Sequence, residues 1–240
     1  MNRQDPSTNR IIAIIPAAGT GTRAQRPGEA GLPKQYRTLS GVPMVKRSVL
    51  ALLADNRVAQ VRVAVSPGDT LAAEVLAGLP RTLVRHCGGQ TRDETVLQAL
   101  QDAALGPEDW ALVHDAARPG LPPDALRRLL DACLSTNQGG LLAMPVADTV
   151  KQASPGTAAG SPLVSATVPR DTLWLAQTPQ MFKASELIEA LVQSMLSGVK
   201  VTDEASAMEA AGHRPLLVQG SWRNAKVTLP DDFSWVESWL

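Results

Sequence analysis

The strongest constraint on the fold is a regular alternation of short apolar runs with segments whose apolar residues recur at helical spacing. Ile11 to Ile15 is a β-branched run with the length of a fully buried strand. Similar runs follow at residues 61–65, 82–86, 110–114 and 140–146. Strands that alternate with helices are typical of a mostly parallel sheet with helices on both faces. We therefore expect an α/β fold of this kind.

Helical patterns fill the intervals between these runs and continue beyond them. In the segment that begins at Pro123, Leu126, Leu129, Leu130 and Cys133 fall on one helical face, and proline suits the first turn of a helix. Ligands of such sheets bind beyond the carboxyl ends of the strands, where the polar loops of this chain fall. The other predicted helices cover residues 41–54, 70–78, 91–105, 184–197, 205–211 and 231–240, and further extended pieces cover 216–219 and 224–228.

The alternation stops between residues 147 and 175. A turn signal rich in glycine and proline at 153–162 separates two short extended runs, the second at 163–168. This pattern predicts a β-hairpin that stands out from the body, although a loose surface loop also fits it. Because such a hairpin buries little by itself, we expect a dimerisation arm that packs on another subunit. The remainder shows no second core, so we expect one domain over residues 10–240 behind a loose tail at 1–9.

Size, charge and cysteine content narrow the functional classes. A chain of 240 residues can bury a large core without disulfides, and its formal net charge of +0 and 3% aromatic content give no basis for binding nucleic acid. Cys87 and Cys133 stand apart, without metal or redox spacing, which indicates buried thiols in a reducing compartment. The first apolar run is too short for a membrane span. We expect a cytoplasmic protein with no membrane or nucleic-acid partner.

A candidate phosphate-binding loop follows the first apolar run. Ala17, Ala18 and Gly19 open a glycine-rich segment that holds Arg23 and leads to Lys34. Small residues allow a ligand close to the backbone, and glycines let several N–H groups point to one place. The P-loop pattern GxxxxGK and the dinucleotide pattern GxGxxG do not occur here. This stretch alone is equally compatible with phosphate binding and with a solvated surface loop.

Polar residues also follow other expected strands. Gly89 to Thr95 couples a glycine turn to a helix start, which suits an anion or a base but also plain N-capping. Asp115 stands at the end of another strand, where it can hold a substrate hydroxyl or Mg²⁺, or pair structurally with Arg118. His114 is expected to be a hydrogen-bonded core residue, because no second His or Cys stands at metal spacing.

Other chemistry finds little support in the sequence. It contains no G-x-S-x-G elbow for a serine nucleophile, and cationic residues dominate the candidate loops, which disfavours a paired-carboxylate hydrolase. Asp203 and Glu204 are explained most simply as negative charge at a helix start. The remaining polar residues of interest each fit an ordinary turn, arm or surface position: Asp148, Thr149, Arg170, Thr178, Pro179, Gln180 and Lys226.

Several segments, taken in order, carry a resemblance that no single one carries: AAGTGTR, LPKQY, GGQTRDETV, HDAARP, PVADTVK, LAQTPQMF, TDEASAME and NAKVT. From about Ile11 to its C-terminus the chain closely resembles the 2-C-methyl-D-erythritol 4-phosphate cytidylyltransferase family. The resemblance implies a Rossmann-like nucleotidyltransferase three-layer sandwich whose arm locks a homodimer. It also implies transfer of CMP from CTP to methylerythritol phosphate, with release of pyrophosphate, for isoprenoid precursors of the non-mevalonate pathway. A cytidylyltransferase for another polyol phosphate, such as ribitol 5-phosphate, and a nucleotide-binding regulator without turnover are the alternatives.

The resemblance implies a role for residues at each matching position. The catalytic cations around the triphosphate would be Arg23, Lys34 and Lys226. The CTP site would be lined by Ala17, Ala18, Gly19, Gly89, Gln90, Arg92 and Thr95. The second substrate would be held by Asp115, Arg118, Thr149 and Thr178, with Arg170 reaching over from the partner's arm. The sequence departs from the family in a longer loop, where Arg26 competes with Arg23, and at Gln90 and Thr95, where an acid or small residue and a serine are usual.

The implied chemistry is nucleotidyl transfer between two anions. A phosphomonoester has a second pKa of about 6 and is mostly dianionic at neutral pH, so it attacks without a general base. Catalysis then consists of positioning and charge neutralisation by fixed cations and by Mg²⁺ held mainly by the CTP phosphates. The sequence therefore predicts a cluster of cations at one rim of the sheet.

Overall fold

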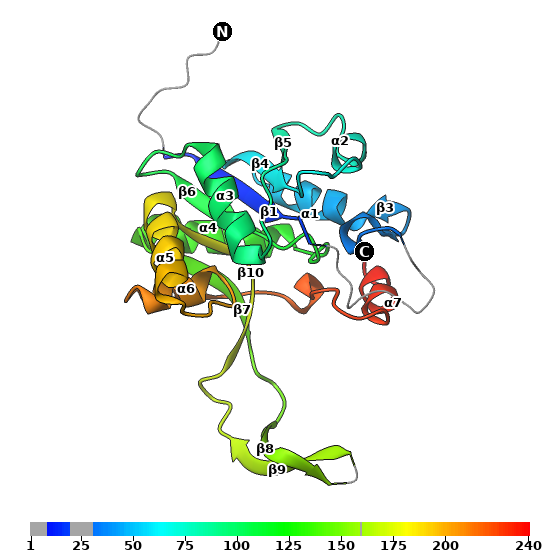
Figure 1. The fold of residues 1–240 in the computed structure, drawn as a ribbon, viewed down its shortest axis with the longest axis vertical. Coiled ribbons are helices and arrows are strands. Elements are labelled where there is room, and N and C mark those ends of the chain that lie inside the picture. Colours follow the sequence, from blue (N-terminus) through cyan, green and yellow to red (C-terminus); the bar gives the residue numbers. More distant parts are fainter. Residues whose placement is uncertain (1–8, 20–30, 159) are drawn as a thin grey trace.

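The computed structural model describes residues 9–19, 31–158 and 160–240 (Figure 1). Within them, a 7-stranded sheet in the order β11-β7-β10-β6-β1-β4-β5 forms the centre. Neighbouring strands are parallel except where β10 pairs with β6 and β7, so the sheet is mostly parallel, as predicted. Its strands are β1 (Ile11–Pro16), β4 (Val58–Ala64), β5 (Thr82–Arg85), β6 (Trp110–Val113), β7 (Gly140–Pro145), β10 (Trp174–Lys183) and β11 (Leu216–Gln219).

The sequence does not predict β10. It indicates a turn at residues 178–180, whereas these residues lie within a strand of 10 residues. β10 runs antiparallel between β6 and β7, and its register with β7 shifts between Ala176 and Gln180. The irregularity accommodates Pro179, which cannot donate to a regular ladder, and the polar neighbours that resemble a turn. Pairing with two buried strands therefore overrides the local turn signal.

Helices cover both faces of the sheet and complete three layers (Figure 1). Along β1, Ala13 and Ile15 pack into one core with α1 and α4, whereas Ile12 and Ile14 pack into a second core with α3, α5 and α6. Successive side chains of a strand point to opposite faces, so β1 is apolar and buried on both. The predicted three-layer α/β sandwich is confirmed. Its helices are α1 (Met44–Leu53), α2 (Ala72–Val75), α3 (Arg92–Ala103), α4 (Pro123–Thr136), α5 (Ala184–Ser197), α6 (Glu204–Ala210) and α7 (Asp232–Glu237).

A third, smaller core fastens the C-terminal segment to the body. Val227 packs with Leu39 and Met44, and all three are fully buried. Its N–H also donates to the carbonyl oxygen of Ala117 over 2.9 Å. These contacts fix the backbone next to Lys226. The short elements nearby are β2 (Thr38–Leu39), β3 (Val42–Pro43) and 3₁₀ helices at Lys34–Tyr36 and Trp222–Asn224.

Most predicted boundaries agree with the structure to within a few residues. α5 and β11 have the predicted bounds. α1 begins later than predicted, because β3 pairs with β2 before the helix starts. None of the helices in the described part of the chain combines the length and the apolar character that a membrane span requires.

The predicted hairpin is present and projects far from the sheet (Figure 1). β8 (Val150–Ala158) pairs antiparallel with β9 (Ser161–Val168). The side chains of β9 are almost all exposed, among them Leu163 and Val164. The division into one domain at 10–240 with a dimerisation arm at 147–175 stays a prediction. Residues 1–8 of the expected tail lie outside the described residues.

Candidate active site

A cavity of about 280 Å³ opens where β1 and β6 end. Its lining comes from segments far apart in the sequence: the loops after β1, β5 and β6, the start of α3, and the segment before α7. This is the edge of the sheet at which the sequence predicts a site. The predicted site residues that line the cavity are Ala17, Ala18, Gly19, Lys34, Gly89, Gln90, Arg92, Thr95, Asp115 and Lys226.

One wall of the cavity is built from backbone and small residues. Ala17 N donates to the Ala64 carbonyl oxygen over 2.7 Å, and the Ala17 carbonyl accepts from Gln35 Nε2 over 2.9 Å. A Cβ at Gly88 would stand only 2.3 Å from Ala18 Cβ. Glycine is therefore required where the loop after β5 meets the loop after β1. A ligand can approach this wall closely.

The loop before α3 forms another wall and is braced by its own side chains. Thr91 and Glu94 form a capping box, and Glu94 Oε2 accepts from Gln90 N over 2.8 Å. The Thr95 hydroxyl accepts from Gly89 N over 3.1 Å and donates to the Thr91 carbonyl over 2.8 Å. The same loop therefore caps the start of α3 and lines the cavity, so both interpretations of its sequence hold. Because the Thr95 hydroxyl and the N–H groups of Gly89 and Gln90 are bound within the loop, the loop offers a ligand mainly carbonyl groups and the Gln90 side chain.

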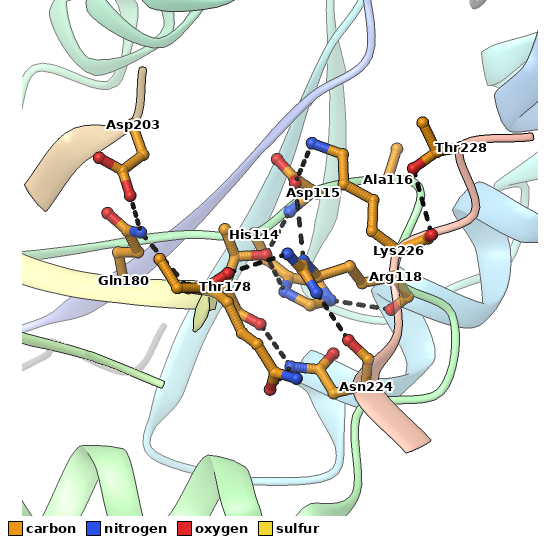
Figure 2. Close-up of polar contacts among 12 residues, drawn as sticks. His114, Asp115, Ala116, Arg118, Thr178, Gln180, Asp203, Asn224, Lys226 and Thr228 are labelled. Carbon is orange, nitrogen blue, oxygen red and sulfur yellow. Dashed lines mark hydrogen bonds and ion pairs between the residues drawn. The ribbon is translucent and has the colours of Figure 1, made fainter. Parts of the chain in front are cut away.

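Asp115 lines the cavity and lies among several positive charges, of which Arg118 and Lys226 are labelled in Figure 2. Its Oδ2 lies 2.8 Å from Lys226 Nζ, and its Oδ1 lies 3.1 Å from Arg92 Nε. Arg118 Nε stands further away, 3.7 Å from Oδ2. Burial opposes ionisation of this carboxyl group, but the nearby positive charges outweigh it and hold the pKa of Asp115 well below its usual value. Asp115 is thus an anion shared by several cations rather than the partner of Arg118 alone.

Lys34 and Lys226 meet at this cavity. Lys34 Nζ donates to the Val227 carbonyl oxygen over 2.8 Å, which ties it to the residue after Lys226. The Lys226 side chain is 41% exposed, so its ammonium group is open to a ligand while Asp115 holds it. The third predicted cation, Arg23, and its alternative Arg26 lie outside the described residues.

His114 is a buried core residue next to Asp115, as the sequence predicts (Figure 2). Its Nδ1 lies 3.0 Å from Thr178 Oγ1, and its Nε2 lies 3.1 Å from the Arg118 carbonyl oxygen. Thr178 Oγ1 accepts from Asp115 N over 2.9 Å, so its proton is available to Nδ1, and Nε2–H donates to the carbonyl. Burial lowers the pKa of His114 to about 4. The neutral ring links β6, β10 and the loop that carries Arg118.

Acid is expected to destabilise the protein through His114. The pKa of this residue falls from 6.5 to about 4 on folding, so the unfolded chain binds the proton first. The stabilising contribution of the neutral ring is complete above pH ~6.5 and decreases by up to about 3 kcal/mol as the pH falls toward 4. Urea unfolding of the wild type and of His114→Gln, at neutral pH and near pH 4.5, measures this contribution.

The exposed residue His86 provides the control, because His86→Gln removes a histidine from the surface rather than from the core and should change the free energy of unfolding by less than about 0.5 kcal/mol. His114→Gln should be less stable than the wild type at neutral pH, and the difference should narrow in acid. A difference that stays constant across this range would contradict the proposed protonation state of His114.

The other residues predicted to hold the second substrate do not line this cavity. Arg118 is buried, and its guanidinium donates to the carbonyl oxygens of Asn224 over 2.7 Å and Ala176 over 3.3 Å. Thr149 and Arg170 are exposed at the base of the arm. Thr149 does not line the cavity of its own chain, because it lies after the end of β7, directly before the first strand of the arm.

Glu204 belongs to the surroundings of the site, whereas the sequence indicates for it only a negative charge at a helix start. It is 0% exposed, and its two carboxylate oxygens lie 2.6 and 3.1 Å from the Nη1 and Nη2 atoms of Arg92. A signal for its burial exists in the sequence. Glu204 stands three and four positions before Ala207 and Met208, on the apolar face of α6.

Asn224 and Gln35 also support the site without having been predicted. Asn224 is 0% exposed, donates from Nδ2 to the Thr178 carbonyl over 2.7 Å, and accepts from Arg118 through its own carbonyl (Figure 2). Gln35 holds the carbonyl of Ala17, as described above. Both residues stand next to a predicted catalytic or cation-bearing stretch, but nothing in their spacing distinguishes them from surface amides.

Comparison with known proteins identifies the family. The 2-C-methyl-D-erythritol 4-phosphate cytidylyltransferase family matches residues 11–240. The chain belongs to this family. A relative of that name from Bordetella petrii is 63% identical over 233 residues, which cover 97% of this chain and 100% of the relative. A second one, from Bordetella pertussis, is 61% identical over 230 residues, which cover 96% and 98%.

Solved structures of cytidylyltransferases agree with this membership. A crystal structure of 4-diphosphocytidyl-2C-methyl-D-erythritol synthase matches with a TM-score of 0.80 at 40% identity, covering 96% of this chain and 98% of that one. The 2-C-methyl-D-erythritol 4-phosphate cytidylyltransferase of Francisella tularensis matches with a TM-score of 0.79 at 32% identity, covering 97% and 100%. This member of the family is therefore a nucleotidyltransferase with the α/β fold that its sequence predicts.

Proposed function

We propose that the chain transfers CMP from CTP to 2-C-methyl-D-erythritol 4-phosphate at this cavity, giving 4-diphosphocytidyl-2-C-methyl-D-erythritol and pyrophosphate. The reaction supplies isoprenoid precursors through the non-mevalonate pathway. One observation supports this most strongly: Lys34 and Lys226 converge on a cavity walled by backbone, in a member of the family named for the reaction. Fixed ammonium groups are suited to bind phosphates, and small residues along the wall allow a phosphate to come close to them.

The two walls suggest how the substrates lie. CTP fits along the small residues Ala17 to Gly19, with its phosphates toward Lys34 and Lys226 and its base toward the loop at Gly89 and Gln90. The amide of Gln90 and the backbone of that loop can hydrogen-bond to the edge of cytosine. The second substrate then lies on the side of Asp115. Thr178 acts there through Asp115, whose N–H it accepts, rather than from the cavity lining.

The proposed step is an in-line displacement at the α-phosphorus of CTP. An oxygen of the polyol phosphate forms the new P–O bond, and pyrophosphate leaves with the electron pair of the bond that breaks. The attacking phosphate is mostly dianionic at neutral pH and needs no base. Lys34 and Lys226 neutralise the charge of two anions that otherwise repel each other, and Arg23 would join them from the loop after β1.

We assign Mg²⁺ as the divalent cation of this reaction. Among the described residues, no group of three or more His, Cys, Asp or Glu side chains lies close enough to hold a metal ion. The carboxylate at the cavity, Asp115, already faces Arg92 and Lys226. The residues of the described chain therefore do not form a metal cage, and the cation would be carried by the phosphates of CTP.

The arm is proposed to lock a homodimer in the cytoplasm. Its strand β9 exposes Leu163 at 53% and Val164 at 64%, apolar side chains that a second copy would cover. Arg170 and Thr149, at the base of the arm, would then reach the second substrate in the cavity of the partner. Free thiols at Cys87 and Cys133 fit a reducing compartment.

Arg170→Ala is expected to weaken binding of methylerythritol phosphate without weakening binding of CTP. Loss of one charged hydrogen bond to a phosphate should raise KM for this substrate about tenfold. Steady-state kinetics with each substrate varied in turn measure the two KM values. Lys151→Ala is the matched control, because it removes another arm cation, one that donates to Thr167 within the hairpin. Equal losses for both substrates would show that Arg170 is only a structural residue of the arm.

Release of pyrophosphate tests the proposed function directly. CTP, ATP, GTP and UTP are each offered with methylerythritol phosphate and with ribitol 5-phosphate. Turnover is expected only for CTP with methylerythritol phosphate. Faster turnover with ribitol 5-phosphate would favour the alternative polyol phosphate cytidylyltransferase, and binding of CTP without turnover would favour a regulator.

A further inference from the structure

The ion pair between Glu204 and Arg92 lies behind the cavity. Glu204 is fully buried, and both of its carboxylate oxygens face the same guanidinium group, at 2.6 and 3.1 Å. A buried carboxylate is unfavourable unless it is paired and hydrogen-bonded, and a two-point contact with arginine also fixes the orientation of both groups. The pair is therefore a rigid unit rather than a loose surface contact.

Arg92 extends this contact into the cavity. Its Nε donates to Asp115 Oδ1 over 3.1 Å, while the other oxygen of Asp115, Oδ2, lies 2.8 Å from Lys226 Nζ. Oδ1 of Asp115 therefore contacts Arg92, and Oδ2 contacts Lys226. Because Arg92 holds Oδ1, it orients the carboxylate and so fixes where Oδ2 binds Lys226. The contacts form one continuous chain from Glu204 to Lys226.

The backbone on which Glu204 stands is fixed to the sheet. Gln180, which is 1% exposed on β10, accepts from Ala205 N over 2.7 Å and donates to Asp203 Oδ2 over 2.8 Å (Figure 2). Asp203 also caps α6 through Ser206 N over 2.9 Å. The residues on both sides of Glu204 are therefore held, which makes its carboxylate a preorganised anchor for Arg92.

We propose that Glu204 is a positioning residue for nucleotidyl transfer: it holds Arg92, Arg92 orients Asp115, and Asp115 places the ammonium group of Lys226. The proposal rests on the function proposed above. Without the charge of Glu204, Arg92 keeps Asp115 as its anion and competes with Lys226 for it. Lys226 then loses its fixed position, while the cavity as a whole becomes more positive.

Glu204→Gln is expected to separate kcat from KM. The misplaced Lys226 should lower kcat about thirtyfold, whereas the more positive cavity should leave KM for CTP unchanged or lower it. A loss of folded protein alone would also lower the apparent kcat without changing KM, so kcat is calculated per folded protein, whose concentration is measured by circular dichroism. Glu209→Gln, on an exposed side of the same helix, is the control and should change neither constant.

A double variant tests whether Glu204 acts through Lys226. In Lys226→Ala, the further substitution Glu204→Gln should lower kcat by less than about threefold, because the group being positioned is already missing. The proposal would be overturned if Glu204→Gln lowered kcat by the same factor with and without Lys226. It would also be overturned if Glu204→Gln alone had a normal kcat. If Glu204→Gln does not fold, Glu204→Asp serves in the same comparisons, because it keeps the charge but withdraws it from Arg92.

A measurement without turnover separates this proposal from the proposed function. The lysines of the wild type and the variants are reductively methylated with ¹³C-formaldehyde, and the Lys226 signal is assigned by its loss in Lys226→Ala. Glu204→Gln should move this signal and Glu209→Gln should not. If the wild type releases no pyrophosphate, the proposed function is wrong, and the Lys226 signal alone then tests whether Glu204 positions Lys226. A signal that does not move in Glu204→Gln would overturn the positioning role of Glu204.

Discussion

Replacing Lys226 by alanine is expected to lower kcat about a hundredfold while the protein stays folded. The loss of one preorganised cation removes about 3 kcal/mol of transition-state stabilisation, which corresponds to this factor. The side chain of Lys226 is 41% exposed, so its removal opens no cavity in the core. Lys34→Ala should have an effect of similar size, because its Nζ holds the Val227 carbonyl beside Lys226. Pyrophosphate release at saturating substrates measures kcat, and circular dichroism follows the fold.

Lys200→Ala is the matched control for both lysine variants. Lys200 is exposed and does not line the cavity, so its loss should change kcat less than about twofold. Near-normal turnover in Lys34→Ala or Lys226→Ala would remove the basis for catalysis by charge neutralisation. The sequence predicts the same loss for Arg23→Ala, whose position lies outside the described residues.

Asp115→Asn is expected to destabilise the protein by about 3 kcal/mol or more and to reduce turnover as well. Removing one member of a buried ion cluster leaves a remaining charge uncompensated, here above all that of Arg118, because Arg92 keeps the carboxylate of Glu204. Lys226 also loses its fixed partner. Chemical denaturation at neutral pH measures the free energy of unfolding, and pyrophosphate release measures turnover in the folded variant.

The contribution of Asp115 to the free energy of unfolding decreases as the pH falls. The pKa of Asp115 lies well below its usual value in the folded chain, so its contribution is complete above pH ~4 and is lost only as the pH falls through the lowered value. Asp124→Asn is the control, because it breaks the exposed pair with Arg128 and should change stability by less than about 1 kcal/mol. If Asp115→Asn changed the free energy of unfolding no more than the control does, the charges around Asp115 would not stabilise the fold.

Patterns within single elements are the part of this protein that is predictable from sequence. The apolar run at Ile11–Ile15 predicts a strand, because a strand buried on both faces needs a continuous apolar run. The helical face in residues 123–133 predicts α4, because a helix buried on one face needs apolar residues at a period of 3.6. The core position of His114 follows from the lack of other metal ligands at suitable spacing. β10 could not be predicted in this way, because Pro179 and its polar neighbours are typical of turns and only the strands beside them make a strand favourable.

The sequence by itself determined the α/β architecture, the projecting hairpin and, through segments in order, the family. The tertiary structure alone decided which charges share Asp115, where Thr149 lies, and that Glu204 holds Arg92. Those two residues are 112 positions apart. Periodicity records which face of an element is buried, but an ion pair between distant elements leaves no periodic trace. It exists only because the folded sheet brings the ends of β6, α3 and α6 together, where a buried charge must find its partner.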